Sequence, residues 1–152
     1  MGAVLKKAVI VAVGKVKEGF IRDGIAEYSK RLQRFCDFSV SECEESKRED
    51  ITAESAAILR HMESGYNIVA DLSGENVTSE QLARIIQNAY LSHDKVNLVI
   101  GGSRGVTEQV RGKADKVIAF GKATFPHMLF RLMLCEQLYR AFTINAGLPY
   151  HK

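Results

Sequence analysis

The sequence predicts one domain of the α/β class, organised around a parallel β-sheet. Five strand-like runs alternate with helical segments along the 152 residues, at 8–13, 38–41, 66–72, 96–100 and 117–120. The run at 96–100, Val-Asn-Leu-Val-Ile, is almost continuously apolar, as expected for a central parallel strand covered by helices on both faces. With 46% hydrophobic residues, a chain of this length can bury one compact core.

Helical periodicity describes the segments between the strand-like runs. Apolar residues at spacings of three and four predict a first helix over 20–35 and a second over 51–62. A third helix should start at Thr78, because Thr78 and Gln81 have the spacing of a capping box. Residues 1–7 precede the first run, and we treat them as a short extension without a role in the fold.

The last helix, expected over 127–145, is apolar on more than one face. A surface helix needs only one apolar stripe, so this helix must be covered on several sides. A subunit interface and a central position in the chain's own core both satisfy that requirement. The spacing of Glu136 and Arg140 on this helix favours an intrahelical ion pair.

Composition excludes several classes of protein. A net charge of +3 permits nucleic-acid binding but is too small to indicate it alone. The three cysteines, Cys36, Cys43 and Cys135, form no CxxC motif, which argues against a disulfide framework or a zinc site and favours a reducing cytoplasm. The longest apolar runs are too short to cross a membrane. We therefore expect a cytoplasmic protein without a metal or a membrane anchor.

Two glycine-bearing loops follow strand-like runs, where parallel sheets bind their ligands. The loop at 101–105 reads Gly-Gly-Ser-Arg-Gly, and the loop at 121–126 reads Gly-Lys-Ala-Thr-Phe-Pro. Neither is a Walker A or a GxGxxG motif, so phosphate-loop and dinucleotide sites are disfavoured. Either loop can instead be a plain turn, or a stretch of backbone that approaches a flat ligand closely. In the second loop, Pro126 suits a helix start and Thr124 is a candidate cap.

Candidate reactive groups lie on the last helix and at the carboxyl terminus. Arg131 follows His127 by one helical turn, near the second glycine loop. Tyr150 and His151, next to Lys152, combine groups that suit base stacking and phosphate contact. A frayed end is the other interpretation of this tail.

Several motifs together resemble the RlmH family of ribosomal RNA methyltransferases. They are Phe-Pro-His at 125–127 with Arg131, Glu-Gln-Leu-Tyr-Arg-Ala at 136–141 and Pro-Tyr-His-Lys at 149–152. Segments at 11–15, 27–32 and 100–103 also match in order and spacing, so the resemblance extends over essentially the whole chain.

The resemblance implies a SPOUT-type fold with a deep trefoil knot near the carboxyl end, in a homodimer with its sites at the subunit interface. It implies that S-adenosylmethionine binds in the knot and that the substrate is N3 of a pseudouridine in the large-subunit RNA of assembled ribosomes. The cofactor contacts that it implies are Ala70, Leu72, Gly101, Gly102, Phe120, Gly121, Lys122, Ala123, Thr124 and Phe125. Ala70 stands where the family often has a larger aliphatic residue.

Methyl transfer to a ring nitrogen requires alignment of donor and acceptor and loss of a proton from the acceptor. We assign stabilisation of the developing anion to Arg131, proton acceptance or relay to His127 and His151, and base contact to Tyr150. Three alternatives remain at this stage: a knotted methyltransferase acting on another RNA such as transfer RNA, a non-catalytic ribosome-binding relative, and a nucleotide hydrolase.

Overall fold

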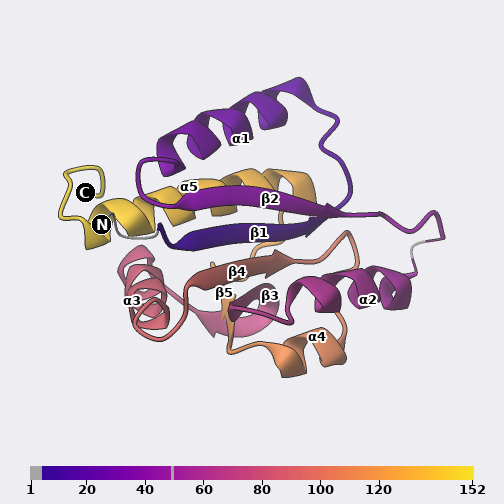
Figure 1. Cartoon of the computed structure of the whole chain (residues 1–152). Coiled ribbons are helices and arrows are strands. Elements are labelled where there is room, and N and C mark those ends of the chain that lie inside the picture. Colours follow the sequence, from indigo (N-terminus) through magenta and orange to yellow (C-terminus); the bar gives the residue numbers. More distant parts are fainter. Residues whose placement is uncertain (1–4, 49) are drawn as a thin grey trace.

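The computed structural model describes residues 5–48 and 50–152 and contains a five-stranded sheet in the order β2-β1-β4-β3-β5 (Figure 1). Every strand pairing in this sheet is parallel, so the predicted α/β fold with a parallel sheet is confirmed. The elements in chain order are β1 (Lys7–Val13), α1 (Gly19–Leu32), β2 (Asp37–Cys43), α2 (Ile51–His61), β3 (Tyr66–Asn76), α3 (Ser79–Ala89), β4 (Lys95–Ile100), α4 (Glu108–Lys113), β5 (Lys116–Ala119) and α5 (His127–Asn145).

Helices cover both faces of the sheet, as Figure 1 shows. Alternate residues of β1 enter two separate core clusters: Ala8 and Ile10 face the side of α1, α3 and α5, whereas Val9 and Val11 face α2 and α4. Two-sided burial explains why these strands read as continuous apolar runs. On its side of the sheet, α5 packs against both α1 and α3.

The multi-faced apolar pattern of α5 is therefore satisfied in large part within one chain. Leu134, Cys135 and Leu138 are buried against the sheet and the neighbouring helices, while Met133 and Gln137 on another side are half-buried. The predicted ion pair is confirmed, since the Arg140 guanidinium lies 2.6 Å from the Glu136 carboxylate.

Some local predictions are confirmed and others are wrong. The capping box at α3 is present: the Gln81 amide donates to the Thr78 hydroxyl at 3.1 Å, and the Thr78 amide donates to the Gln81 side chain at 2.8 Å. Helix α4 was not predicted. Strand β3 continues beyond residue 72 to Asn76. Its register against β5 shifts between Ala70 and Glu75, so both of these residues pair with Ile118 and the pairing continues past the shift.

The amino-terminal segment contributes to the fold from Lys6 onward. Lys7 begins β1, the Asp37 amide donates to the Lys6 carbonyl at 2.9 Å, and the Lys6 ammonium pairs with Asp94 at 2.9 Å. The prediction that residues 1–7 have no role is therefore wrong for Lys6 and Lys7. Residues 1–4 lie outside the described part of the chain.

Cys36, Cys43 and Cys135 are buried free thiols, as the absence of a disulfide pattern predicts. Burial raises the pKa of Cys36 and of Cys135 to about 12, which keeps both thiols protonated and unreactive. Among the described residues, no helix has the length and apolar character needed to cross a membrane.

The connection between β5 and α5 takes an unusual route. Strand β5 is at one edge of the sheet, yet α5 starts near β1. There the Arg131 guanidinium donates to the Val13 carbonyl at the end of β1, at 2.9 Å. Three strand spacings separate β5 from β1, roughly 14 Å, and residues 120–126 can span up to about 24 Å. This connection must therefore pass over the carboxyl ends of β3 and β4.

Candidate functional site

A cavity of about 730 Å³ lies at the carboxyl ends of β3, β4 and β5. Its size is within the range typical of sites for small molecules and cofactors. Three segments build its walls: the end of β3, the loop after β4 and the connection from β5 to α5. The lining residues are Ala70, Asp71, Leu72, Ile100, Gly101, Gly102, Ser103, Arg104, Gly105, Ala119, Phe120, Gly121, Ala123, Thr124, Phe125, Pro126, His127 and Phe130.

The loop after β4 is a tight turn and a cavity wall at the same time. The Gly105 amide donates to the Gly102 carbonyl at 3.0 Å, and Gly105 has a φ of +79°, in the left-handed region. A Cβ atom on Gly101 would lie 2.1 Å from the Gly105 carbonyl oxygen, so this turn has no room for a side chain there. The interpretation of the loop as a tight turn is confirmed, and its close approach to a ligand stays a prediction.

The connection from β5 to α5 forms the opposite wall. Gly121 has a φ of +95°, and its amide donates to the Asn76 side chain at 3.1 Å, which ties this loop to the end of β3. Phe125 stacks on Phe130 with ring centroids 6.4 Å apart, and Phe120 lies 6.1 Å from the same ring. These three rings give the cavity an apolar, aromatic side.

The start of α5 differs from the prediction at its cap. Pro126 is the N-cap and no side chain caps this helix, so the expectation that Thr124 caps it is wrong. The first amides of a helix have no partner within the helix. Because Pro126 and His127 line the cavity, the start of α5 belongs to the cavity wall.

His127 is the one predicted reactive residue that lines the cavity. Its side chain is half-buried, and within the described residues its Nε2 atom is buried without a hydrogen-bond partner. A buried ring nitrogen is costly to leave unpaired. His127 lines the cavity, but its Nε2 atom is not exposed to it, so the assigned hydrogen bond or proton transfer with a ligand stays a prediction.

Arg131 does not face the cavity. Its side chain is 1% exposed, and its guanidinium donates to the Val13 carbonyl at 2.9 Å and the Gly14 carbonyl at 3.0 Å. The same group pairs with the Glu42 carboxylate at 2.6 Å. Arg131 therefore fixes the start of α5 to the ends of β1 and β2, and its assigned contact with the acceptor stays a prediction.

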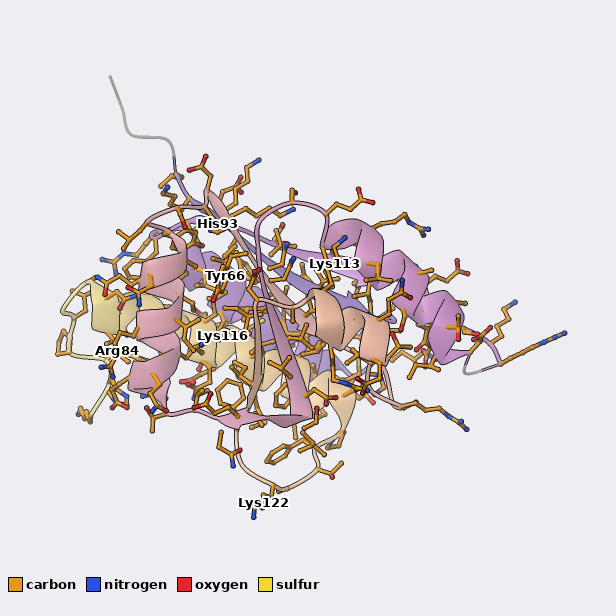
Figure 2. All side chains as sticks on the ribbon, turned by 90° about the horizontal axis from the view of Figure 1, so that it is seen from below. Tyr66, Arg84, His93, Lys113, Lys116 and Lys122 are labelled. Atoms are coloured by element: carbon orange, nitrogen blue, oxygen red, sulfur yellow. The ribbon has the colours of Figure 1, made fainter. Side chains whose placement is uncertain are left out.

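Lys122 is also outside the cavity lining, unlike the other cofactor contacts that the resemblance implies. Its side chain is exposed, and Figure 2 shows it at the tip of the connection, pointing away from the body of the molecule. Ala70, Leu72, Gly101, Gly102, Phe120, Gly121, Ala123, Thr124 and Phe125 all line the cavity.

The tail lies at the opposite end of α5. Tyr150 packs on Tyr139 with ring centroids 4.7 Å apart, and His151 contacts Glu80 and, at 3.1 Å, Arg140. Burial, with a hydrogen bond that its hydroxyl donates to Tyr28, raises the pKa of Tyr150 to about 12. Tyr139 and Arg140, which the tail contacts, lie roughly 18 Å along α5 from His127, so the tail is placed away from the cavity of its own chain.

Sequence reasoning overlooked Asp71, whose side chain lines the cavity between two predicted contacts. Its carboxylate accepts from the Ser73 amide at 3.1 Å and lies 3.7 Å from the Arg111 guanidinium. Its position at the end of a predicted strand was the available signal. Among the described residues, no group of three or more His, Cys, Asp or Glu side chains is arranged to hold a metal ion.

A parallel α/β sheet with a cavity of this size beyond its strand ends defines a class of proteins that bind a small ligand at that edge. The family model described as "Predicted SPOUT methyltransferase" matches residues 6–151. The chain belongs to the SPOUT methyltransferase family.

Similar proteins agree with this family. A protein named ribosomal RNA large subunit methyltransferase H from Clostridium botulinum (strain Langeland) is 42% identical over 155 residues, which cover 94% of this chain and 98% of the relative. One of the same name from Fusobacterium nucleatum is 40% identical, covering 94% and 97%. The solved structure of a probable methylase family protein from Haemophilus influenzae Rd KW20 superposes with a TM-score of 0.58 at 12% identity, covering 95% of this chain and 70% of that one, and supports the fold alone.

The position of Arg131 leads to a prediction about stability. Arg131→Met should lower the free energy of unfolding by about 2–3 kcal/mol, because two buried carbonyls lose their donor. The loss should be smaller than for a fully buried ion pair, since Glu42 is 39% exposed. Urea unfolding followed by circular dichroism measures the change. Arg22→Met, at an exposed position of α1, is the control and should change stability little; equal stability of both variants would contradict the role given to Arg131.

Proposed function

We propose that this protein transfers a methyl group from S-adenosylmethionine to N3 of a pseudouridine in the large-subunit RNA of assembled ribosomes in the cytoplasm. The observation that carries the proposal is the cavity between the loop 101–105 and the connection 120–126. These are the segments at which the resemblance expects the cofactor. The names of the relatives at 40–42% identity support ribosomal RNA as the substrate.

The lining of the cavity fits S-adenosylmethionine. The rings of Phe120, Phe125 and Phe130 offer apolar surface to an adenine, and exposed backbone of the two loops offers donors and acceptors to its edge. The Asp71 carboxylate is placed to accept hydrogen bonds from hydroxyl groups or to face a positive charge. The cofactor would supply an electrophilic methyl group, so the protein itself needs no nucleophile.

The residues of the chain have separate tasks in this reaction. The loops hold the donor and exclude water, which favours alignment with the acceptor. His127, which lines the cavity, is assigned acceptance or relay of the proton from the acceptor nitrogen. Arg131 supports the reaction by holding the first turn of α5, and therefore His127, in place.

The position of the tail supports a homodimer. Tyr150 and His151 pack at the level of Tyr139 and Arg140, roughly 18 Å along α5 from His127 at the cavity wall, which favours contact with a base at the cavity of a second subunit. Half-buried apolar side chains on α5, such as Met133, and the 69% exposed Phe20 on α1 are available for such an interface. The deep trefoil knot stays a prediction, supported by the passage of 120–126 over the ends of β3 and β4.

Transfer of a labelled methyl group tests the proposed function. The protein should label intact ribosomes in preference to free large subunits and transfer RNA, and nuclease digestion should place the label on N3 of one pseudouridine. Label on transfer RNA alone would mean that the substrate is transfer RNA and not ribosomal RNA. Cofactor binding without transfer to any of these RNAs would favour a non-catalytic ribosome-binding relative.

Gly101 tests where the cofactor binds. Gly101→Ala should weaken S-adenosylmethionine binding by at least about tenfold, because the added Cβ would lie 2.1 Å from the Gly105 carbonyl and displace the loop. Titration calorimetry measures the affinity. Gly112→Ala is the matched control, since a Cβ there meets nothing within 4 Å. Unchanged affinity in Gly101→Ala, with the fold intact, would place the cofactor elsewhere.

Mixed dimers test whether the tail acts on the partner's cavity. Deletion of 150–152 and the substitution Gly101→Val should each abolish methyl transfer when every subunit carries the change. A mixture refolded from both variants should regain activity, because one site of each hybrid dimer then combines an intact cavity with an intact tail. An inactive mixture that contains hybrid dimers by mass spectrometry would exclude action of the tail across the interface.

A further inference from the structure

A second concave surface lies outside the cofactor cavity, between α3 and the edge strand β5. It is a groove of about 280 Å³, separate from the 730 Å³ cavity. Its lining mixes polar side chains with the apolar Val77, Ile85 and Ile118, and it contains an aromatic ring. The residues that characterise it are Tyr66, Glu75, Gln81, Arg84, Asn88 and Lys116.

The cations on this side of the molecule have no carboxylate partner. Arg84 and Lys116 line the groove, and Lys113 and Lys122 follow the same edge (Figure 2). All four side chains are exposed, and within residues 5–48 and 50–152 none of them forms an ion pair. Some cations elsewhere are paired, as Arg140 is with Glu136, while others, such as Lys30 and Arg60, are exposed and form no ion pair within the described residues.

The groove carries a small local excess of positive charge, with Arg84 and Lys116 against Glu75. The chain has 21 Lys and Arg against 18 Asp and Glu, so an even distribution would leave little local excess. Glu75 is the carboxylate that lines the groove, against two cations. The groove therefore presents positive charge that can attract an anion.

Lysine on an edge strand has another use, which is to prevent pairing with the edge strand of another molecule. That use accounts for Lys116, which is on β5. It does not account for Arg84 or Asn88, which come from α3 and line the same groove. A bound ligand better explains why cations and amides from two elements, α3 and β5, line the same groove.

The groove leads toward the cofactor cavity along β5. Lys116 lines the groove, and Phe120, four residues further on, lines the cavity. At the rise of a β-strand these positions are roughly 13 Å apart. Lys122 stands beyond Phe120 at the tip of the connection, near the cavity mouth (Figure 2). Arg84 and Lys116 at the groove and Lys122 at the tip of the connection thus lie on the same side of the molecule (Figure 2).

We propose that the groove between α3 and β5 binds the phosphate backbone of the substrate RNA and guides the strand to the cavity; this inference rests on the proposed function. Arg84 and Lys116 contact phosphates, which position a nucleic acid without reading its sequence. Gln81 and Asn88 can bond sugar hydroxyls, and the Tyr66 ring offers a face to an unstacked base.

Binding of ribosomes tests the inference independently of methyl transfer. Arg84→Ala with Lys116→Ala should raise the dissociation constant for intact ribosomes at least about tenfold at 0.1 M salt. The slope of the logarithm of affinity against the logarithm of salt concentration should fall by about 1.5, the share of two phosphate contacts. Affinity for S-adenosylmethionine and the unfolding temperature should not change, because neither residue lines the cofactor cavity.

The matched control removes the same charge elsewhere. Lys30→Ala with Arg60→Ala changes exposed cations of α1 and α2 and should leave both the affinity and the salt slope nearly unchanged. Unaltered binding by the groove variant, or an equal loss in the control, would overturn the inference. If the wild-type protein methylates ribosomes and the groove variant binds them with the same affinity, the inference about the groove is refuted and the proposed function stands. If the wild-type protein binds ribosomes through the groove but transfers no methyl group, the proposed function is refuted and the inference about the groove stands.

Discussion

The contact between Arg131 and the ends of β1 and β2 determines the geometry on which the site depends. It holds the first turn of α5 three strands away from β5, where the preceding connection begins. A short connection between those points can only pass over the ends of β3 and β4. The cavity follows from that route, because the connection closes over a sheet edge that would otherwise be open. A buried guanidinium with carbonyl and carboxylate partners is suited to this task, since its planar donors fix direction as well as distance.

A cavity built from crossing loops fits a reaction in which the cofactor supplies the reactive group. The protein then needs to hold two molecules in line, exclude water and accept one proton. Loops with little side-chain bulk at Gly101, Gly105 and Gly121 allow close approach, while the rings around Phe130 provide apolar surface. The substrate contacts that we propose lie elsewhere: the tail packs on the far half of α5, and the groove between α3 and β5 is along the sheet edge. One subunit therefore carries these parts at separate places, and a dimer would bring the tail of one subunit to the cavity of the other.

Periodicity and strand-end position predicted much of this structure. The parallel sheet, the capping box at Thr78 and both glycine loops of the cavity could be placed from residue patterns, because each depends on local chemistry. Helix α4 was overlooked because six residues are too few to show a period. The extension of β3 depends on a register shift against Ile118, which alternation along one strand does not encode.

The candidate reactive residues show where sequence patterns are insufficient. Arg131 and His127 are one turn apart on α5, yet one side chain enters the core and the other lines the cavity. That difference is set by the ends of β1 and β2, which are distant in sequence. Lys122 lies within a predicted contact segment, but the turn at Gly121 directs its side chain outward. The tail also matched a site motif while lying at the other end of the helix from the cavity in its own chain.

The most direct measurement is a crystal structure of the protein with S-adenosylmethionine. We expect the cofactor between the loop 101–105 and the connection 120–126, with its adenine against the Phe120 and Phe130 rings and the tail of a second subunit near the methyl group. Cofactor density outside this cavity would contradict the site. A cavity whose mouth faces away from every other subunit would contradict the role of the tail.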